Sequence, residues 1–257
     1  HASLIDGSRL SGATVRTFSH NNIENLKAIL NSINKENQKE KRILIVTEGI
    51  FSMDGDTPPI KEIIKLKEQH QTLLLLDEAH SFGIIGESGK GFAHRENCIK
   101  GVDFLMTTFG KSAGAAGSVT VSSRTWTELI LNRARSFIYS TAPMPSQAAA
   151  ALAGLRLIKG KLGEERRGTL HRNIDHLCNE LQIPRPQGAI IPLIIGDELH
   201  ALKIAENLHR EGILAPAIRY PTVSKGSARI RITVSANHSE KDIAFLVKKI
   251  KKSLNNI

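Results

Sequence analysis

The chain has 257 residues, of which 40% are hydrophobic, enough for one large domain or two moderate ones. No stretch of the sequence approaches the roughly 18 uninterrupted apolar residues of a membrane span, so we expect no membrane partner. The formal net charge of +10 favours anionic substrates, although many lysines fall on predicted helix surfaces. Because aromatic residues do not alternate with the basic ones, we expect no nucleic-acid partner.

The two cysteines, Cys98 and Cys178, are isolated and far apart. They indicate neither a disulfide framework nor a metal site, so we expect a reducing, cytoplasmic compartment and no bound metal. The chain starts at His1 and shows no signal peptide. We expect a further segment to precede this residue.

The first part of the chain alternates predicted strands and helices. Apolar residues at helical spacing predict a helix from Asn22 to about Asn37, with Asn21 or Asn22 as its cap. Further helices are expected after Pro58-Pro59, over 126–135 and over 147–159. Strands are predicted at 14–18, 42–48, 73–76, 102–108 and 118–122. This alternation is typical of an α/β fold with a mostly parallel, doubly wound sheet.

The composition changes around residues 160–163, where we predict a domain boundary. We expect a large domain over 1–160 and a smaller α+β domain over 161–257. The second part predicts helices at 164–181, 199–211 and 240–254, and strands at 189–195, 213–216 and 228–234.

Polar clusters follow three of the predicted strands, at residues 48–55, 77–80 and 107–111. Ligands of open α/β sheets bind outside the carboxyl ends of the strands. The three clusters are therefore expected to line one crevice.

The cluster Asp77-Glu-Ala-His80 invites comparison with a nucleotide hydrolase. Gly110-Lys111-Ser112 matches the end of a phosphate-binding loop, but the first glycine of that motif is replaced by Leu105 inside a predicted strand. A surface loop with incidental charge is also a weak explanation, because Asp77 follows four leucines and a buried carboxylate needs a partner.

An aldehyde cofactor explains the residue types better. Pyridoxal phosphate (PLP) needs a lysine for a Schiff base and an acid at its pyridinium nitrogen, which Lys111 and Asp77 could supply. His80 could reach the ring hydroxyl, and Thr108 with the glycine-rich backbone offers donors to the phosphate.

Two further candidates have plain structural alternatives. Ser52 lies in a loop of the same crevice, where a lone serine is more often a turn residue. Arg231 alternates with apolar residues on the same strand face as Arg229. That face is either solvated or a bidentate clamp for the carboxylate of an amino acid.

Seven motifs in order make the chain resemble a known family. They are His1-Ala-Ser3, Thr47–Asp56, Asp77–His80, Gly86–Gly91, Thr108–Lys111, Ile138–Thr141 and Ala217–Val223. The chain resembles the α-oxoamine synthases, PLP enzymes of the aspartate-aminotransferase fold (fold type I), and most of all the branch that acts in biotin biosynthesis.

The resemblance implies a role for each site residue. Lys111, Asp77 and His1 would be catalytic: the Schiff-base lysine, the partner of the pyridinium nitrogen and a ring that stacks on the cofactor. Cofactor contacts would also come from His80, Ser52, Thr108 and Ala79, and substrate contacts from Thr222, Arg231 and His1. Ser140 and Thr141 would reach the phosphate in a neighbouring subunit, because family members are homodimers with shared active sites.

The implied reaction is a decarboxylative condensation of L-alanine with a pimeloyl thioester of coenzyme A or acyl carrier protein. Ser81-Phe82-Gly83 instead resembles the sphingolipid-forming relatives, whereas Ala217–Val223 matches the biotin branch. A sister synthase therefore stays open, such as a glycine 2-amino-3-ketobutyrate ligase or a serine palmitoyltransferase-like enzyme. A truncated homologue that acts only as a binding partner is the non-enzyme alternative.

Overall fold

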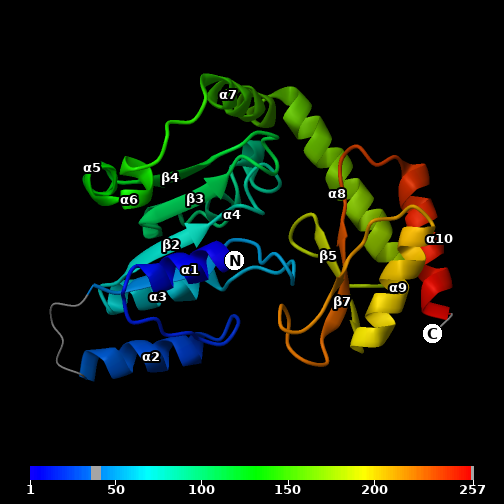
Figure 1. Cartoon of the computed structure of the whole chain (residues 1–257), viewed down its shortest axis with the longest axis horizontal. Helices are drawn as coiled ribbons and strands as arrows, with labels where there is room; N and C mark the ends of the chain where they lie inside the picture. The colour runs from blue at the N-terminus through cyan, green and yellow to red at the C-terminus, as the bar shows by residue number, and fades with distance from the viewer. Residues whose placement is uncertain (36–41, 256–257) are drawn as a thin grey trace.

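The computed structural model describes residues 1–35 and 42–255 (Figure 1). Its helices are α1 (Ala2–Leu10), α2 (Ile23–Lys35), α3 (Ile60–Gln69), α4 (Phe92–Arg95), α5 (Arg124–Arg133), α6 (Arg135–Ile138), α7 (Pro145–Lys159), α8 (Lys161–Leu181), α9 (Glu198–Arg210) and α10 (Glu240–Asn255), with 3-10 turns η1 (Glu87–Gly89) and η2 (Ile99–Gly101). Its strands are β1 (Leu44–Glu48), β2 (Leu73–Asp77), β3 (Phe104–Thr108), β4 (Ser118–Ser122), β5 (Ile190–Gly196), β6 (Ala217–Ile218) and β7 (Ala228–Thr233). The helix end predicted near Asn37 lies outside the described residues.

The first sheet has the order β1-β2-β3-β4, in which β1, β2 and β3 are parallel and β4 is antiparallel to β3. This confirms the mostly parallel sheet. Leu74 and Leu76 are fully buried and pack with side chains of α2 and α3, which explains the uninterrupted apolar run of β2. The carboxyl ends of the three parallel strands lie at one edge, where the predicted crevice should be.

The second sheet is antiparallel, with the order β5-β7-β6. Ile230 and Ile232 of β7 are buried in a core with α8, α9 and α10. Because side chains alternate along a strand, Arg229 and Arg231 lie on the other face. Figure 1 shows β5 and β7 between the first sheet and helices α9 and α10. The predicted domain boundary falls at the junction of α7 and α8, and the division into two domains stays a prediction.

Two predicted strands are wrong. Residues 14–18 form neither helix nor strand, because β-type composition gives no strand without a neighbour to pair its backbone groups. Residues 213–216 are also irregular: the amide of Ile213 donates to the Leu208 carbonyl at 2.9 Å and closes the end of α9. Pro216 has no N–H to donate and offers β7 only its carbonyl, which accepts from the Arg231 amide at 2.9 Å, so strand β6 itself begins at Ala217.

Helix α1 was not predicted, since Gly7 lies within it and glycine disfavours a helix interior. Asn22 caps α2 as expected, with its side chain accepting from the Asn25 amide at 2.8 Å. Among the described helices, none is both long enough and apolar enough to cross a membrane.

Candidate active site

Two buried carboxylates stand at the ends of neighbouring strands. The register places Glu48 of β1 opposite Asp77 of β2, and their residues are 6% and 4% exposed. Carboxylates lose solvation at such positions and need hydrogen bonds or positive charges beside them. Their partners therefore define the site.

Asp77 is held by one hydrogen bond and faces a lysine. The amide of Ala79 donates to Asp77 Oδ1 at 2.8 Å, and Oδ2 receives no hydrogen bond within the described chain. Burial raises the pKa of the Asp77 carboxyl, and the charge of Glu48 raises it further, whereas the Ala79 hydrogen bond and Lys111 lower it. One carboxylate oxygen thus remains available to a ligand.

The loop that carries Lys111 is closed on itself. Thr108 Oγ1 donates to the Gly117 carbonyl at 3.1 Å and accepts from the Gly110 amide at 3.2 Å. Ser112 Oγ donates to the Phe82 carbonyl at 2.7 Å, which joins this loop to the segment after His80. The small residues around Lys111 therefore form a tight turn that contacts the segment following Asp77–His80.

The charges of three side chains shift the pKa of the Lys111 amine. Burial lowers the pKa of its amine, Asp77 and Glu48 raise it, and Arg231 of β7 lowers it. Burial, followed by the charges of Lys111 and Arg231, lowers the pKa of the His80 imidazole to about 4. His80 is therefore neutral at pH 7, with one ring nitrogen able to donate and the other able to accept.

Arg231 comes to this site from the second sheet. Its Nε donates to the Ser52 carbonyl at 2.7 Å, and its Nη1 donates to Thr233 Oγ1 at 3.2 Å. The solvated strand face considered from the sequence is therefore wrong for this arginine, which is half-buried against the loop after β1. Ser52 is half-buried in the same loop.

The remaining predicted site residues, His1, Ser140, Thr141 and Thr222, are exposed. The backbone nitrogen of His1 donates to Glu48 Oε1, while the imidazole is exposed. Ser140 and Thr141 are exposed after α6, and Ser140 Oγ donates to the Phe137 carbonyl rather than into the cluster. Thr222 is exposed, and its amide donates to the Arg219 carbonyl.

Sequence reasoning missed Glu48 and Glu78 as buried acids of this region. Glu78 is 1% exposed and accepts from the amides of Phe92 and Ala93 and from Ser81 Oγ, each at 2.7 Å. Its position between Asp77 and Ala79, after four leucines, was the available signal. Glu78 fixes the loop that presents Asp77 and His80, and all its hydrogen bonds are structural.

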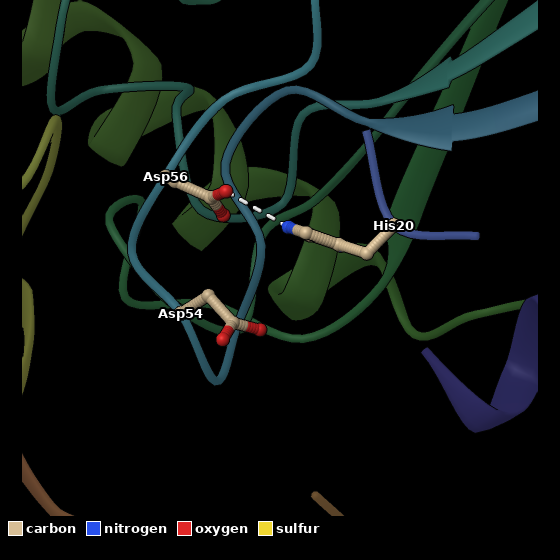
Figure 2. Close-up of side chains that lie close together, drawn as sticks. All are labelled: His20, Asp54 and Asp56. Atoms are coloured by element: carbon tan, nitrogen blue, oxygen red, sulfur yellow. Dashed lines mark hydrogen bonds and ion pairs between the residues drawn. The ribbon is translucent and has the colours of Figure 1, made fainter. Parts of the chain in front are cut away.

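A separate cluster comprises His20, Asp54 and Asp56, whose ligating atoms lie within 4.8 Å of one another. Figure 2 shows the His20 ring pointing at the Asp56 carboxylate, with an Nε2 to Oδ2 distance of 2.8 Å. Asn21 Nδ2 donates to the same Asp56 oxygen, and Arg229 pairs with Asp54 at 2.6 Å. Asp56 Oδ1 is buried and has no hydrogen-bond partner within the described residues, whereas Asp56 Oδ2 and Asp54 Oδ1 already accept from protein donors. We assign no metal to the cluster.

Comparisons with known proteins agree with the resemblance drawn from the motifs. A curated 8-amino-7-oxononanoate synthase of Bordetella petrii is 41% identical over 244 residues, which cover 93% of this chain and 60% of that protein. A second, from Acidithiobacillus ferrooxidans, is 41% identical and is covered to 64%. The chain therefore spans about three fifths of the length of these relatives.

Solved structures show the same fold. Serine palmitoyltransferase of Sphingomonas wittichii has a TM-score of 0.93 at 28% identity, covering 100% of this chain and 64% of that one. An 8-amino-7-oxononanoate synthase from Francisella tularensis has a TM-score of 0.82 at 26% identity, with 100% and 73% covered. The predicted PLP-dependent transferase fold of type I is confirmed. Since the family described as aminotransferase class I and II matches residues 1–250, the chain belongs to that family.

Proposed function

We propose that the protein containing this chain is a PLP-dependent C-acyltransferase of biotin biosynthesis, acting in the cytoplasm. It would condense L-alanine with the pimeloyl thioester of coenzyme A or acyl carrier protein, giving 8-amino-7-oxononanoate, carbon dioxide and the free thiol. The observation that carries the proposal is the convergence of Lys111, Asp77, His80 and Arg231 from two sheets. The named relatives at 41% identity support the substrate class.

The residues present fit PLP. Asp77 has one oxygen on the Ala79 amide and one without a hydrogen bond in the described chain, as required of a carboxylate that pairs with a pyridinium N–H. His80 is neutral and can donate to the ring oxygen. The backbone turn of Thr108 to Gly117 offers small residues for a close phosphate contact. A structural relative, serine palmitoyltransferase, has been solved with PLP.

Each remaining contact is proposed from the family motifs. Lys111 would hold the cofactor aldehyde. The other cofactor contacts would come from Ser52, Thr108, Ala79, the ring of His1, and Ser140 and Thr141 across a dimer. Thr222 and Arg231 would contact the substrate.

Lys111 is suited to a second task, that of a base. Burial lowers the pKa of its amine, so a larger fraction is neutral and able to take the α-proton of alanine onto Nζ. When bound, PLP supplies an electron sink for the pair left on the α-carbon. Arg231 can hold the alanine carboxylate, since its fork offers parallel donors, and this fixes the α-proton relative to Lys111.

A sister synthase is the second candidate, because the fold agreement with serine palmitoyltransferase is high. Product analysis separates the two. Full-length protein is given alanine, glycine or serine with pimeloyl, acetyl, succinyl or palmitoyl thioesters. We expect 8-amino-7-oxononanoate from alanine and the pimeloyl donor; a palmitoyl product with serine would reject the biotin assignment.

Covalent attachment tests the site independently of the substrate. Borohydride reduction of full-length protein incubated with PLP, followed by peptide mapping, should place the adduct on Lys111. An adduct on another lysine would refute the assignment.

A homodimer with shared active sites is part of the proposal. Phe137, Tyr139 and Met144 flank Ser140 and Thr141 and are more than 60% exposed, which supports a partner surface at this place. Mixing Lys111→Ala subunits with Thr141→Ala subunits should restore activity in part if the two residues serve one site from different chains. Mixtures no more active than their parents would exclude sharing.

A further inference from the structure

Two arginines of β7 hydrogen-bond to the same loop, residues 49–56, which follows β1 of the first sheet. Arg231 Nε donates to the Ser52 carbonyl, and Arg229 Nη1 donates to the Met53 carbonyl at 3.1 Å and to Asp54 Oδ1 at 2.6 Å. The arginines alternate with buried isoleucines, so both project from the face of β7 that is turned away from the helical core. The loop is thus bonded at three successive residues.

Arg229 and Arg231 differ in what they can offer a ligand. The Arg229 side chain is 7% exposed, and its hydrogen bonds all go to protein: Nε to Ser227, Nη1 to Met53 and Asp54. A buried guanidinium requires such pairing. Arg231 is only half-buried and uses Nε and Nη1, while its Nη2 donates to no group of the described chain. Nη2 of Arg229 also donates to no group of the described chain, but the Arg229 guanidinium is buried, so this residue fastens the loop. The more exposed Arg231 keeps a donor that a substrate can reach.

The loop is also fixed from its other side. His20 and Asn21 bind Asp56 at 2.8 and 2.9 Å. The Gln187 amide donates to the Gly55 carbonyl at 3.1 Å. Gly55 has a φ of +68°, and a Cβ there would lie 2.4 Å from the Ile190 carbonyl oxygen of β5. The loop is therefore packed between the 20–21 segment and the second sheet, and the Arg229–Asp54 pair sets its distance from β7.

We propose that Arg229 and Asp54 form a positioning pair that aims Arg231 at the carboxylate of the amino-acid substrate. The inference rests on the proposed function for the presence of that carboxylate. Arg231 Nε donates to the Ser52 carbonyl of this loop. A shift of the loop relative to β7 would therefore turn the Arg231 guanidinium and change the direction of its Nη2 donor. Bidentate recognition loses strength when the fork is misplaced.

The test uses Asp54→Asn in full-length holoenzyme, since Asp54 is 42% exposed and asparagine keeps its shape while removing the charge. The matched control is Glu206→Gln, which breaks the Glu206–Arg210 pair of the same 2.6 Å length on the exposed surface of α9. Affinity for L-alanine is read from the change in the cofactor absorbance. We expect Asp54→Asn to weaken alanine binding roughly tenfold and to lower kcat by a smaller factor, because the α-proton is also positioned less well relative to Lys111. Glu206→Gln should match the wild type in both.

Two further measurements separate positioning from a general loss of structure. The double variant Asp54→Asn, Arg231→Lys should bind alanine no worse than Arg231→Lys alone, because both act through one guanidinium. In cofactor-free protein, amide hydrogen exchange of residues 49–56 should be faster in Asp54→Asn than in Glu206→Gln. Wild-type alanine affinity in Asp54→Asn, or additive losses in the double variant, would overturn the proposal.

Failure of the proposed function gives a different pattern. The clamp acts on the α-carboxylate that alanine, glycine and serine share, so the comparison is run with all three. Binding of glycine or serine in place of alanine would reject the proposed substrate, and the Asp54→Asn effect would then be expected on that amino acid.

Discussion

Glu48 and Asp77 are register partners in adjacent parallel strands, and both carboxylates are buried beside Lys111. The charge of Glu48 raises the pKa of Asp77 and also that of Lys111. Two neighbouring carboxylates separate each other's pKa values, because their negative charges repel. Both favour the protonated, charged form of a nearby amine. Glu48 thereby tunes groups that it does not contact by any hydrogen bond in the described chain.

Replacing Glu48 with glutamine should therefore lower the pKa of the Lys111 amine. The neutral amine is the reactive form, so Lys111 should be modified by an amine-directed reagent at lower pH than in the wild type. The measurement is the pH midpoint of Lys111 labelling in cofactor-free protein, followed by mass spectrometry. Glu206→Gln on exposed α9 is the control, and an unchanged midpoint in Glu48→Gln would contradict the electrostatic coupling.

His80 should make stability depend on pH in a defined window. Its folded pKa of about 4 lies below the ordinary value of 6.5, so the unfolded chain takes up the proton first as pH falls. The stabilisation is fully present above pH 6.5 and is lost as pH falls towards 4. The loss is roughly 2 kcal/mol once solvent screening of the partly exposed ring is included.

Urea unfolding between pH 4 and 7 measures this term. His80→Asn cannot take up a proton, so its unfolding free energy should fall less steeply with acid than that of the wild type. Parallel curves for the two proteins would show that His80 carries no such linkage.

Gly91→Ala should be strongly destabilising. The glycine has a φ of +94°, and a Cβ there would lie 1.7 Å from Glu78 Oε2. The methyl group would displace a carboxylate that holds the Phe92 and Ala93 amides, which we expect to cost about 3 kcal/mol or more. Chemical denaturation gives the number. Gly168→Ala is the control, because that glycine lies on α8 with only a flexible arginine near its Cβ position; equal stabilities would refute the clash.

Arg231→Ala should mainly weaken binding of the amino acid. Removing the guanidinium takes away the donors proposed for the carboxylate and also the bond to the Ser52 carbonyl. We expect at least a tenfold rise in KM for alanine, with a smaller change in KM for the thioester. Steady-state kinetics of full-length protein with each substrate varied in turn decides this, and an unaltered KM for alanine would exclude the clamp.

Most of the fold could be predicted from the sequence, because local patterns specify it. The leucine run of β2 and the helical spacing of α2 are such patterns, and the carboxyl ends of parallel strands meet at one edge by geometry alone. The two wrong strands, 14–18 and 213–216, failed for want of a partner and because of Pro216. Pairing is a long-range property that composition does not carry.

The sequence by itself determined the family and the candidate residues: Lys111 in a loop of small residues, and Asp77 and His80 at a strand end. Only the tertiary structure decided which charges act on them. Strand register brings the charge of Glu48 near Asp77. The charge of Arg231 acts on Lys111 because Arg231 of β7 bonds to the loop of Ser52, a residue 179 positions earlier in the chain. Those influences depend on distance and burial in three dimensions, which a linear order of residues does not specify.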